Sequence, residues 1–425
     1  MYLEEVKPTE PKLETELKLP IFQVLGDRNY RFLWPAETGL QMARWMWMLV
    51  SGYMVLKLTD SAFQTALVGV AFTAPMLLGG VISGIVADAV NRKHVLLWVF
   101  AANALLAGFA GILVFSELIV HWHILAFSLL IGTAHTLDQV ARRTFVADLV
   151  NRESLHTAFA LDQMGHTTGV MIGPFIGGLI LEFTTEVGFQ NVGWCYLTVA
   201  TFYTCSLVLV SFIRPPRKQQ LVPVRYSSIL TIVAEGFRAM MGSRALIGVV
   251  GVSVILNLAF PSHRTLIPVF AEKVLLVSPT AMGALGAAQG IGSILGSMFI
   301  ASRRNIDRKS RYYYLGAMIG MVSLTFFGLS TDYPISFLAL LIAGIGMSGF
   351  GAMQATMLLL ATEEKIRGRV MGIMSMFIGV MPLGTLILGG LAEWLGPGNA
   401  VFVTAAAGVV LTGGWSYLSK EMRKV

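Results

Sequence analysis

The sequence predicts an all-α integral membrane protein, with about twelve transmembrane helices in two parallel-repeat six-helix bundles. The chain of 425 residues is 55% hydrophobic and only 13% charged, about half the charged share of an average soluble domain. Apolar stretches of roughly 20 residues, long enough to cross a bilayer, recur along it. Glycines repeat as well. The interval from Gly84 to Gly296 equals that from Gly177 to Gly389, as two similar halves would require.

The apolar stretches define the predicted spans in chain order. Few charged residues fall inside them, and mostly short polar segments separate one span from the next. The spans lie near 31–57, 62–87, 95–117, 122–145, 153–183, 190–213, 244–271, 280–302, 311–330, 333–361, 367–392 and 398–419.

Basic residues gather in alternate connections, and acidic or neutral polar residues predominate in the others. Under the positive-inside rule, this pattern puts both termini in the cytoplasm and predicts a multi-pass protein of the plasma (inner) membrane. The connections account for the formal net charge of +7, so we expect no nucleic acid partner. The alternating basic residues include Arg92, Lys93, Arg142, Arg143, Arg152, Arg214, Arg217, Arg303, Arg304, Lys365, Arg367 and Lys420.

The spans divide the chain into two bundles and three polar segments. We predict a cytoplasmic tail at 1–28, an N-terminal bundle at 29–213, a cytoplasmic linker at 214–243, a C-terminal bundle at 244–419 and a short cytoplasmic tail at 420–425. Within the linker, 229–241 mixes apolar and charged residues, which is typical of an interfacial amphipathic helix.

No pattern indicates an enzyme, a metal site or a cofactor. The sequence has no P-loop, GxSxG or HExxH motif on any span. Gly344, Gly346 and Gly349 fit a dinucleotide fingerprint, but apolar residues continue on both sides, so we interpret them as a close helix crossing. His121 and His123 have no third ligand nearby, and we interpret them as loop histidines.

A stripe of glycines marks span 5. Gly165, Gly169, Gly173 and Gly177 recur every four residues, which allows a neighbouring helix to approach closely. Pro174 predicts a kink, because its ring displaces one intrahelical hydrogen bond. The stripe is open to two interpretations, tight packing alone or a bend that also serves conformational switching.

Several motifs resemble a known family. Residues 84–93, GIVADAVNRK, look like the loop 2–3 motif of the major facilitator superfamily, and 169–178 look like the span 5 motif of its antiporters. Residues 138–155 are similar to the transmembrane secretion effectors, the branch that contains enterobactin and macrolide exporters. Residues 268–270 and 367–371 fit the same branch. The resemblance covers 29–418 and implies alternating access by two six-helix bundles, without naming a substrate.

The resemblance also implies a gate, in which Asp88 and Arg92 form an inner ion pair that favours the outward-facing state. Simple loop anchoring is the alternative. The chain departs from the family pattern at three positions. Ala89 replaces a basic residue and Asn91 a glycine, and Arg44 stands where many relatives carry a small or acidic residue. Relatives often have an acid linked to proton coupling at the position of Arg44, and this chain lacks that acid there.

Charged residues within spans are the main functional candidates, because a charge at the bilayer centre costs about 2.5–3.5 kcal/mol on insertion scales. Glu37, Gln41 and Arg44 share one helix face in span 1. We favour cavity lining for this face over a structural ion pair. In span 4, Asp138 and Arg142 share a face with His135, and belong either to an inner structural network or to the transport machinery.

A proton-coupled cycle needs a group that binds a proton on one side and releases it on the other. Asp162 and His166 lie one turn apart in span 5, and partly desolvated carboxylate or imidazole groups titrate near neutral pH. Glu37, Asp162 and His166 are therefore the candidates for proton coupling, with interhelical hydrogen bonding as the alternative. Gly173 and Pro174 join Asp88, Arg92, Asp138 and Arg142 as candidate gating residues.

Polar residues in the second half extend the predicted cavity. They are Asn257 and Arg264 in span 7, Gln289 in span 8 and Gln354 in span 10. If Arg44 and Arg264 both face inward, the pathway has a positive potential and prefers amphipathic substrates with an anionic or electron-rich group.

We therefore predict a secondary active transporter, a proton-coupled exporter of small amphipathic molecules such as siderophores, drugs or secondary metabolites. Its expected partners are the substrate, protons and the lipid bilayer, and we expect a monomer without cofactors. The alternatives are an uptake or lysolipid transporter of the same fold, and a membrane sensor or receptor that has lost transport.

Overall fold

The computed structural model describes residues 20–77, 90–151, 154–183, 189–214, 237–303 apart from 239, 308–362, and 370–419 apart from 371–373 and 375. Every regular element in these ranges is helical. The first half contains α1 (Pro20–Gly26), α2 (Arg28–Thr59), α3 (Ala62–Thr73), α5 (Arg92–Phe115), α6 (His121–Leu149), α7 (Leu155–Phe183) and α8 (Gln190–Ser211).

The second half begins with an interrupted span and continues with five further helices. Its elements are α10 (Arg244–Ala259), η3 (Pro261–Leu266), α11 (Ile267–Phe270), η4 (Ala271–Leu275), α12 (Pro279–Ala301), α13 (Lys309–Leu329), α14 (Tyr333–Leu360), α16 (Met381–Leu395) and α17 (Pro397–Leu418).

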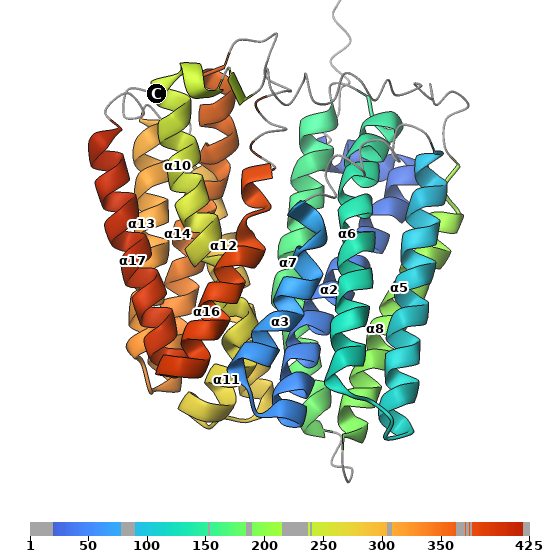
Figure 1. The fold of residues 1–425 in the computed structure, drawn as a ribbon. Helices are drawn as coiled ribbons and strands as arrows, with labels where there is room; N and C mark the ends of the chain where they lie inside the picture. Colours follow the sequence, from blue (N-terminus) through green and yellow to red (C-terminus); the bar gives the residue numbers. More distant parts are fainter. Residues whose placement is uncertain are drawn as a thin grey trace, which may run out of the picture.

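The two halves stand side by side as separate bundles, with the C-terminus at the upper end of Figure 1. Ten helices in the described ranges are long and apolar enough to cross a membrane. The more polar α2, and the shorter apolar segment Ala62–Leu77 that contains α3, bring the count to the predicted twelve. The chain is thus a multi-pass membrane protein, and the prediction of two six-helix bundles is confirmed.

Short polar residues set the ends of many helices. Asp27 accepts hydrogen bonds from the backbone N–H groups of Asn29 and Tyr30, at 2.8 and 3.0 Å, and so caps α2. At the other end of α2, Asp60 adopts a left-handed conformation with φ 51°, which turns the chain directly towards α3. The observed spans therefore begin and end close to the predicted positions.

Span 7 is one candidate membrane span, Arg244–Leu275, close to the predicted 244–271, but its helix type changes along it. α10 ends at Ala259, and the chain continues as the 3-10 turn η3, the short helix α11 and the π-helical turn η4. Pro261 and Pro268 explain the interruption, because each lacks the N–H that would continue the α-helical ladder. The two prolines are visible in the sequence, and the change in helix type follows from them.

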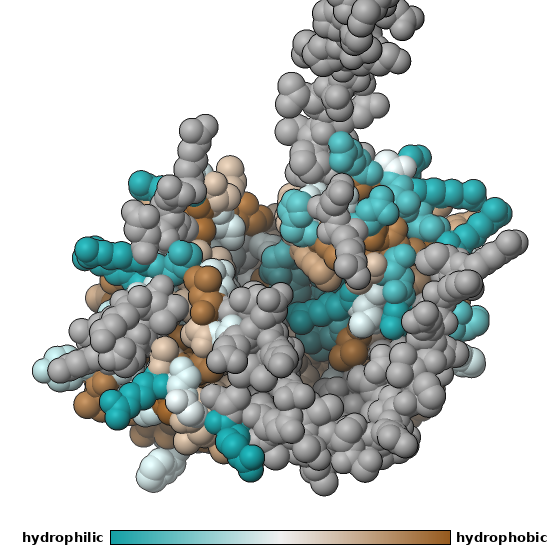
Figure 2. Space-filling view, turned by 90° about the horizontal axis from the view of Figure 1, so that it is seen from above, coloured by the Kyte–Doolittle hydropathy of each residue, from teal (hydrophilic) through white to brown (hydrophobic). Residues whose placement is uncertain are grey.

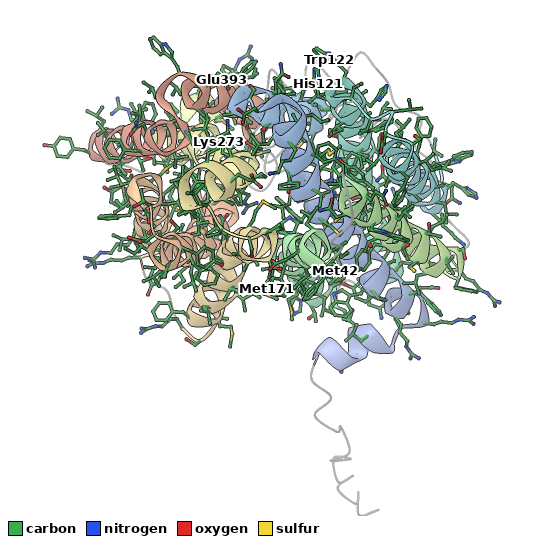
Figure 3. All side chains as sticks on the ribbon, turned by 90° about the horizontal axis from the view of Figure 1, so that it is seen from below. Met42, His121, Trp122, Met171, Lys273 and Glu393 are labelled. Atoms are coloured by element: carbon green, nitrogen blue, oxygen red, sulfur yellow. The ribbon has the colours of Figure 1, made fainter. Side chains whose placement is uncertain are left out.

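The glycine stripe of α7 packs against α2. A Cβ atom built on Gly169 would lie 2.4 Å from the Cβ of Gln41, and one on Gly173 would lie 2.5 Å from the carbonyl oxygen of Met42. Figure 3 shows Met42 beside α7, on the helix that the stripe contacts. The packing interpretation is confirmed; the predicted switching role of Gly173 and Pro174 stays a prediction.

The same helix also contacts the opposite bundle. A Cβ atom on Gly178 would lie 2.4 Å from the carbonyl oxygen of Pro279, and one on Gly283 would lie 2.6 Å from that of Pro174. The backbones of α7 and α12 therefore meet directly across the interface between the bundles. Close backbone contact of this kind requires small residues on both helices.

The fingerprint-like glycines of α14 also lie at helix crossings. A Cβ on Gly344 would lie 2.1 Å from the carbonyl oxygen of Gln289, and one on Gly346 would lie 2.7 Å from that of Gly316. This confirms the helix-crossing interpretation of that motif. Most of the predicted amphipathic helix at 229–241 lies outside the described residues.

Replacing Gly169 by valine should separate α7 from α2, because the new side chain has no space beside Gln41. Overpacking of this kind costs about 1–3 kcal/mol. We expect a lower temperature of thermal unfolding for the purified protein in detergent, followed by tryptophan fluorescence. Gly413→Val is the matched control, since nothing lies within 4 Å of its Cβ position. Equal unfolding temperatures for the two variants would contradict this account of the stripe.

Candidate functional site

Ion pairs join the two bundles at the end opposite the C-terminus. Lys57 at the end of α2 lies 2.7 Å from Glu272 in η4. Lys273, which Figure 3 shows on this face, lies 2.8 Å from Asp60 and also donates to its carbonyl oxygen. The hydrogen bond from Lys273 lowers the pKa of the Asp60 carboxyl below its ordinary 3.8, so this carboxylate stays charged at neutral pH.

Two further carboxylates each bind the first turn of a helix in the other bundle. Glu393 of α16 accepts hydrogen bonds from the hydroxyl of Ser61 and the backbone N–H of Phe63 at the start of α3, both at 3.0 Å. Glu182 of α7 accepts from the backbone N–H of Thr280 at the start of α12, at 2.9 Å. Helix N-termini favour negative charge, so both contacts stabilise this end in the closed state.

At the opposite end, the described residues leave a hollow between the bundles. Figure 2, seen from the end that carries the C-terminus, shows hydrophilic residues gathered in a hollow between the two halves. The interface is thus closed by ionic and backbone contacts at one end and hollowed at the other.

A buried ionic network lies inside the first bundle, where α2, α6 and α7 meet. Arg142 lies 3.1 Å from Glu37 and 3.7 Å from Asp138, and it forms an ion pair with Asp162. Arg44 lies 3.2 Å from Asp138 and donates to the Gln41 side chain at 2.8 Å. Three carboxylates therefore share two guanidinium groups, which leaves the network one positive charge short when all are ionised.

Glu37 has the weakest hydrogen bonding in this network. Neither of its carboxylate oxygens makes a hydrogen bond of good geometry within the described part of the chain, although one lies near Arg142. Only 4% of Glu37 is exposed. A buried carboxylate is costly when charged unless it is paired, and Arg142 is the ion-pair partner of Glu37 among the described residues.

A cavity of about 440 Å³ lies between the bundles, within the size range of small-molecule sites. One wall is α7, and the others are α12, α14 and the junction of α10 with η3. The lining residues are Gln163, His166, Thr167, Val170, Phe260, Pro261, Arg264, Gln289, Gly290, Ser293, Ser297, Met347, Ser348, Gly351 and Ala352.

Arg264 connects the cavity to the first bundle. Its Nε donates to Gln289 at 2.8 Å, and its guanidinium lies 4.8 Å from the centre of a Trp45 ring on α2. The His166 ring meets Trp45 edge-on, with ring centres 6.0 Å apart. These four side chains come from four different elements and converge at the interface between the bundles.

Three of the predicted functional residues line this cavity, namely Arg264, Gln289 and His166. Glu37, Gln41 and Arg44 share the predicted face but are not part of the lining. Their side chains lie instead in the ionic network, because Asp138 and Arg142 on α6 supply the opposite charges. The ion-pair alternative thus describes their position in this conformation.

Asn257 and Gln354 also lie away from the cavity lining. Asn257 donates to the backbone carbonyl of Ser253 at 2.8 Å, and Gln354 donates to the Ser253 hydroxyl at the same distance. Both amides therefore hydrogen-bond within the second bundle. Sequence reasoning missed Trp45, Gln163 and the serines of α12, although Trp45 directly follows the singled-out Arg44.

The predicted gating residues fall in three places. Asp88 lies outside the described residues, while Arg92 forms an ion pair with Asp148 at the end of α6. Asp138 and Arg142 belong to the ionic network, and Gly173 and Pro174 lie where α7 meets α2 and α12.

In the described part of the chain, no group of three histidine, cysteine or acidic side chains is placed to hold a metal ion. His121 contacts the ring of Trp122 instead, at the edge of the first bundle (Figure 3).

The family model described as "Transmembrane secretion effector" matches residues 21–424 of the chain. Among curated proteins, the chain is similar to the enterobactin exporter EntS of Escherichia coli O1:K1 / APEC, with 26% identity over 377 residues. That alignment covers 85% of this chain and 86% of the relative. EntS of Shigella boydii serotype 18 (strain CDC 3083-94 / BS512) matches with the same identity and coverage.

Solved transporter structures share the fold. A bacterial homologue of the human lysosomal transporter Spinster, in an inward-facing and unoccupied conformation, aligns with a TM-score of 0.72 at 16% identity, covering 96% of this chain and 98% of that one. The nucleoside transporter NupG aligns with a TM-score of 0.69 at 16% identity, covering 91% and 98%. At these identities the likeness concerns the fold of the major facilitator superfamily.

Removing the carboxylates that bind the opposite bundle should loosen the closed end. In Glu182→Gln/Glu393→Gln, each contact loses its charge, which is worth about 0.3–1 kcal/mol at a helix N-terminus. A reporter cysteine at Thr65, which is fully buried behind this end, should then react several-fold faster with a soluble maleimide in detergent. Glu117→Gln is the control, because the exposed Glu117 lies at the same end in the turn before α6. If the cysteine stays equally protected in both backgrounds, the carboxylates do not hold this end closed.

Proposed function

The chain belongs to the transmembrane secretion effector family, and on that premise we propose that it is a proton-coupled exporter of small amphipathic molecules. The observation that carries the proposal is the cavity between two bundles that are joined at one end and hollowed at the other. Alternating access requires a central site with one end closed at a time. The name of the similar enterobactin exporters supports export over uptake.

Orientation follows from the positive-inside rule. Basic residues near the described helix ends, such as Lys93, Arg244, Arg303 and Lys309, follow the same alternate connections as the C-terminus. We propose that this end is cytoplasmic, that the protein resides in the inner membrane and that the structure is inward-facing. That the protein works as a monomer stays a prediction.

The ionic network supports proton coupling. It contains three acids and two arginines, so one proton can be held there without creating an excess of positive charge. We assign that proton to Glu37, whose oxygens have the fewest hydrogen bonds. Asp162 already forms an ion pair with Arg142. When Glu37 is protonated, Asp162 competes for the same guanidinium and keeps it paired with a carboxylate.

The helices that carry the network also reach the cavity. On α2, Arg44 belongs to the network and its neighbour Trp45 contacts Arg264. On α7, Asp162 belongs to the network and His166, one turn later, lines the cavity. A shift of either helix on protonation therefore changes the cavity wall, which gives a physical route for coupling proton movement to substrate movement.

Glu37→Gln should uncouple the cycle. Glutamine mimics the protonated acid and cannot release a proton, so uphill transport driven by a pH gradient should fall at least about fivefold, since typical coupling energies are about 1–3 kcal/mol. Downhill exchange of substrate across proteoliposomes should continue. Both rates are measured with the same reconstituted protein and the same fluorescent amphiphile.

Asp162→Asn and His166→Gln test the competing assignments in the same assay, and Glu117→Gln controls for the loss of a carboxylate elsewhere. Gradient-driven transport that persists in Glu37→Gln but is lost in Asp162→Asn or His166→Gln would move the proton site to that residue.

A pH jump in proteoliposomes tests the function as a whole, with a panel containing a siderophore, a macrolide and a lysolipid. Movement of a panel compound out of the compartment on the cytoplasmic face, with counterflow of protons, supports the exporter. Flux in the reverse direction would show uptake, preference for the lysolipid would show lipid transport, and binding without flux would show a sensor or receptor.

A further inference from the structure

Arg264 is a membrane-embedded cation without a carboxylate partner. Among the described residues, no aspartate or glutamate lies within ion-pair distance of it, and no acidic side chain contributes to the cavity lining. Gln289 accepts from its Nε, and Trp45 covers the guanidinium through its ring. Neither of these neutral groups supplies a negative charge.

Arg44 provides the contrast inside the same molecule. Arg44 is buried, whereas Arg264 is only partly buried and lines the cavity. Arg44 lies 3.2 Å from Asp138 and makes a further hydrogen bond to Gln41. Its charge is compensated within the first bundle. Of the two arginines from which a positive potential is expected, Arg264 is the one that lines the cavity.

The backbone around Arg264 holds it in place. It lies on η3, directly after the proline that ends α10, and this interruption turns the chain at the cavity wall. Broken helices line substrate sites in many secondary transporters. Burial of an unpaired charge in a membrane is expensive, so a cation held in this way stabilises the protein most when an anion binds beside it.

The rest of the lining is suited to an apolar, flat molecule. Phe260, Pro261, Val170 and Met347 form apolar parts of the wall, and the Trp45 ring stacks on one face of the guanidinium. Serine hydroxyls and the Gln163 amide are polar but uncharged. A ligand with an aromatic body and a single anionic group would therefore satisfy both parts of the lining.

We propose that this cavity contains an anion-binding subsite formed by Arg264, Gln289 and Trp45, and that its ligands are aromatic amphiphiles with a carboxylate or similar oxyanion. The oxyanion accepts hydrogen bonds from the guanidinium N–H groups that Gln289 leaves available, and the aromatic body packs against the apolar wall. The inference deepens the proposed transport function, because it names the substrate class of the same cavity.

Equilibrium binding of a matched ligand pair tests the subsite on the intact protein in lipid nanodiscs. The pair is 1-naphthoate and 1-naphthamide, which share their size and ring system and differ in charge at neutral pH. Isothermal titration should show tighter binding of 1-naphthoate to the unmodified protein. A charge-assisted hydrogen bond of this kind corresponds to about 10- to 100-fold in affinity.

Arg264→Gln should remove that preference and leave the affinity for 1-naphthamide within about twofold. Arg264→Lys should retain part of the preference for 1-naphthoate, because lysine keeps the charge but loses the planar contact with Trp45. Arg303→Gln is the matched control. Arg303 is exposed beyond the end of α12 and lies over Phe299, away from the cavity lining.

Equal affinities of the two ligands for the unmodified protein would overturn the proposal, and this measurement does not depend on whether a variant folds. An equal loss of affinity for both ligands in Arg264→Gln would also overturn the proposal. The outcome is separate from that of the proposed function. Proton-driven export without a preference for the anion would refute only the subsite, whereas anion preference without any flux would refute only the transport.

Discussion

Arg142 contacts acids from three helices in the membrane interior, and the arrangement of the first bundle depends on these ion pairs, with Arg44 as the second cation. Glu37 comes from α2, Asp138 from α6 and Asp162 from α7. Without a cation at their centre, three carboxylates would not share a buried site, because the repulsion between them is only weakly screened there. The low dielectric that makes the network costly also makes it sensitive to a single proton.

The second requirement of the fold is direct contact between the two bundles, and small residues make this contact possible. The contact of α7 with α12 leaves no space for side chains at Gly178 and Gly283. One helix therefore takes part in the ionic network, the cavity wall and the contact between the bundles.

Much of the architecture could be predicted from the sequence, because hydropathy and basic residues report on the membrane directly. The spans, the two bundles and the packing role of the α7 glycines follow from local patterns. The partners of charged groups could not be predicted in the same way. Arg44 and Asp138 lie far apart in the sequence, and helix periodicity gives the face of a residue without giving the helix that it meets.

The residues of the cavity could likewise be predicted from the sequence only in part. Arg264 and Gln289 stand out because polar residues are rare in spans, whereas Trp45 does not, since aromatic residues are common throughout membrane helices. The interruption of span 7 could be predicted from Pro261 and Pro268. Its consequence, a 3-10 turn that places Arg264 at the cavity wall, could not, because η3 packs against helices of both bundles, α16 and α3 among them.

The closed end contains a symmetry that follows from the repeat. Glu182 at the end of span 5 binds the start of span 8, and Glu393 at the end of span 11 binds the start of span 2. Each bundle thus supplies the cap for a helix of the other. When the bundles part, two helix N-termini lose their partners together, and restoring only one of them leaves the other exposed. Any opening at this end would therefore have to break a contact in each half of the repeat, which links the two halves energetically.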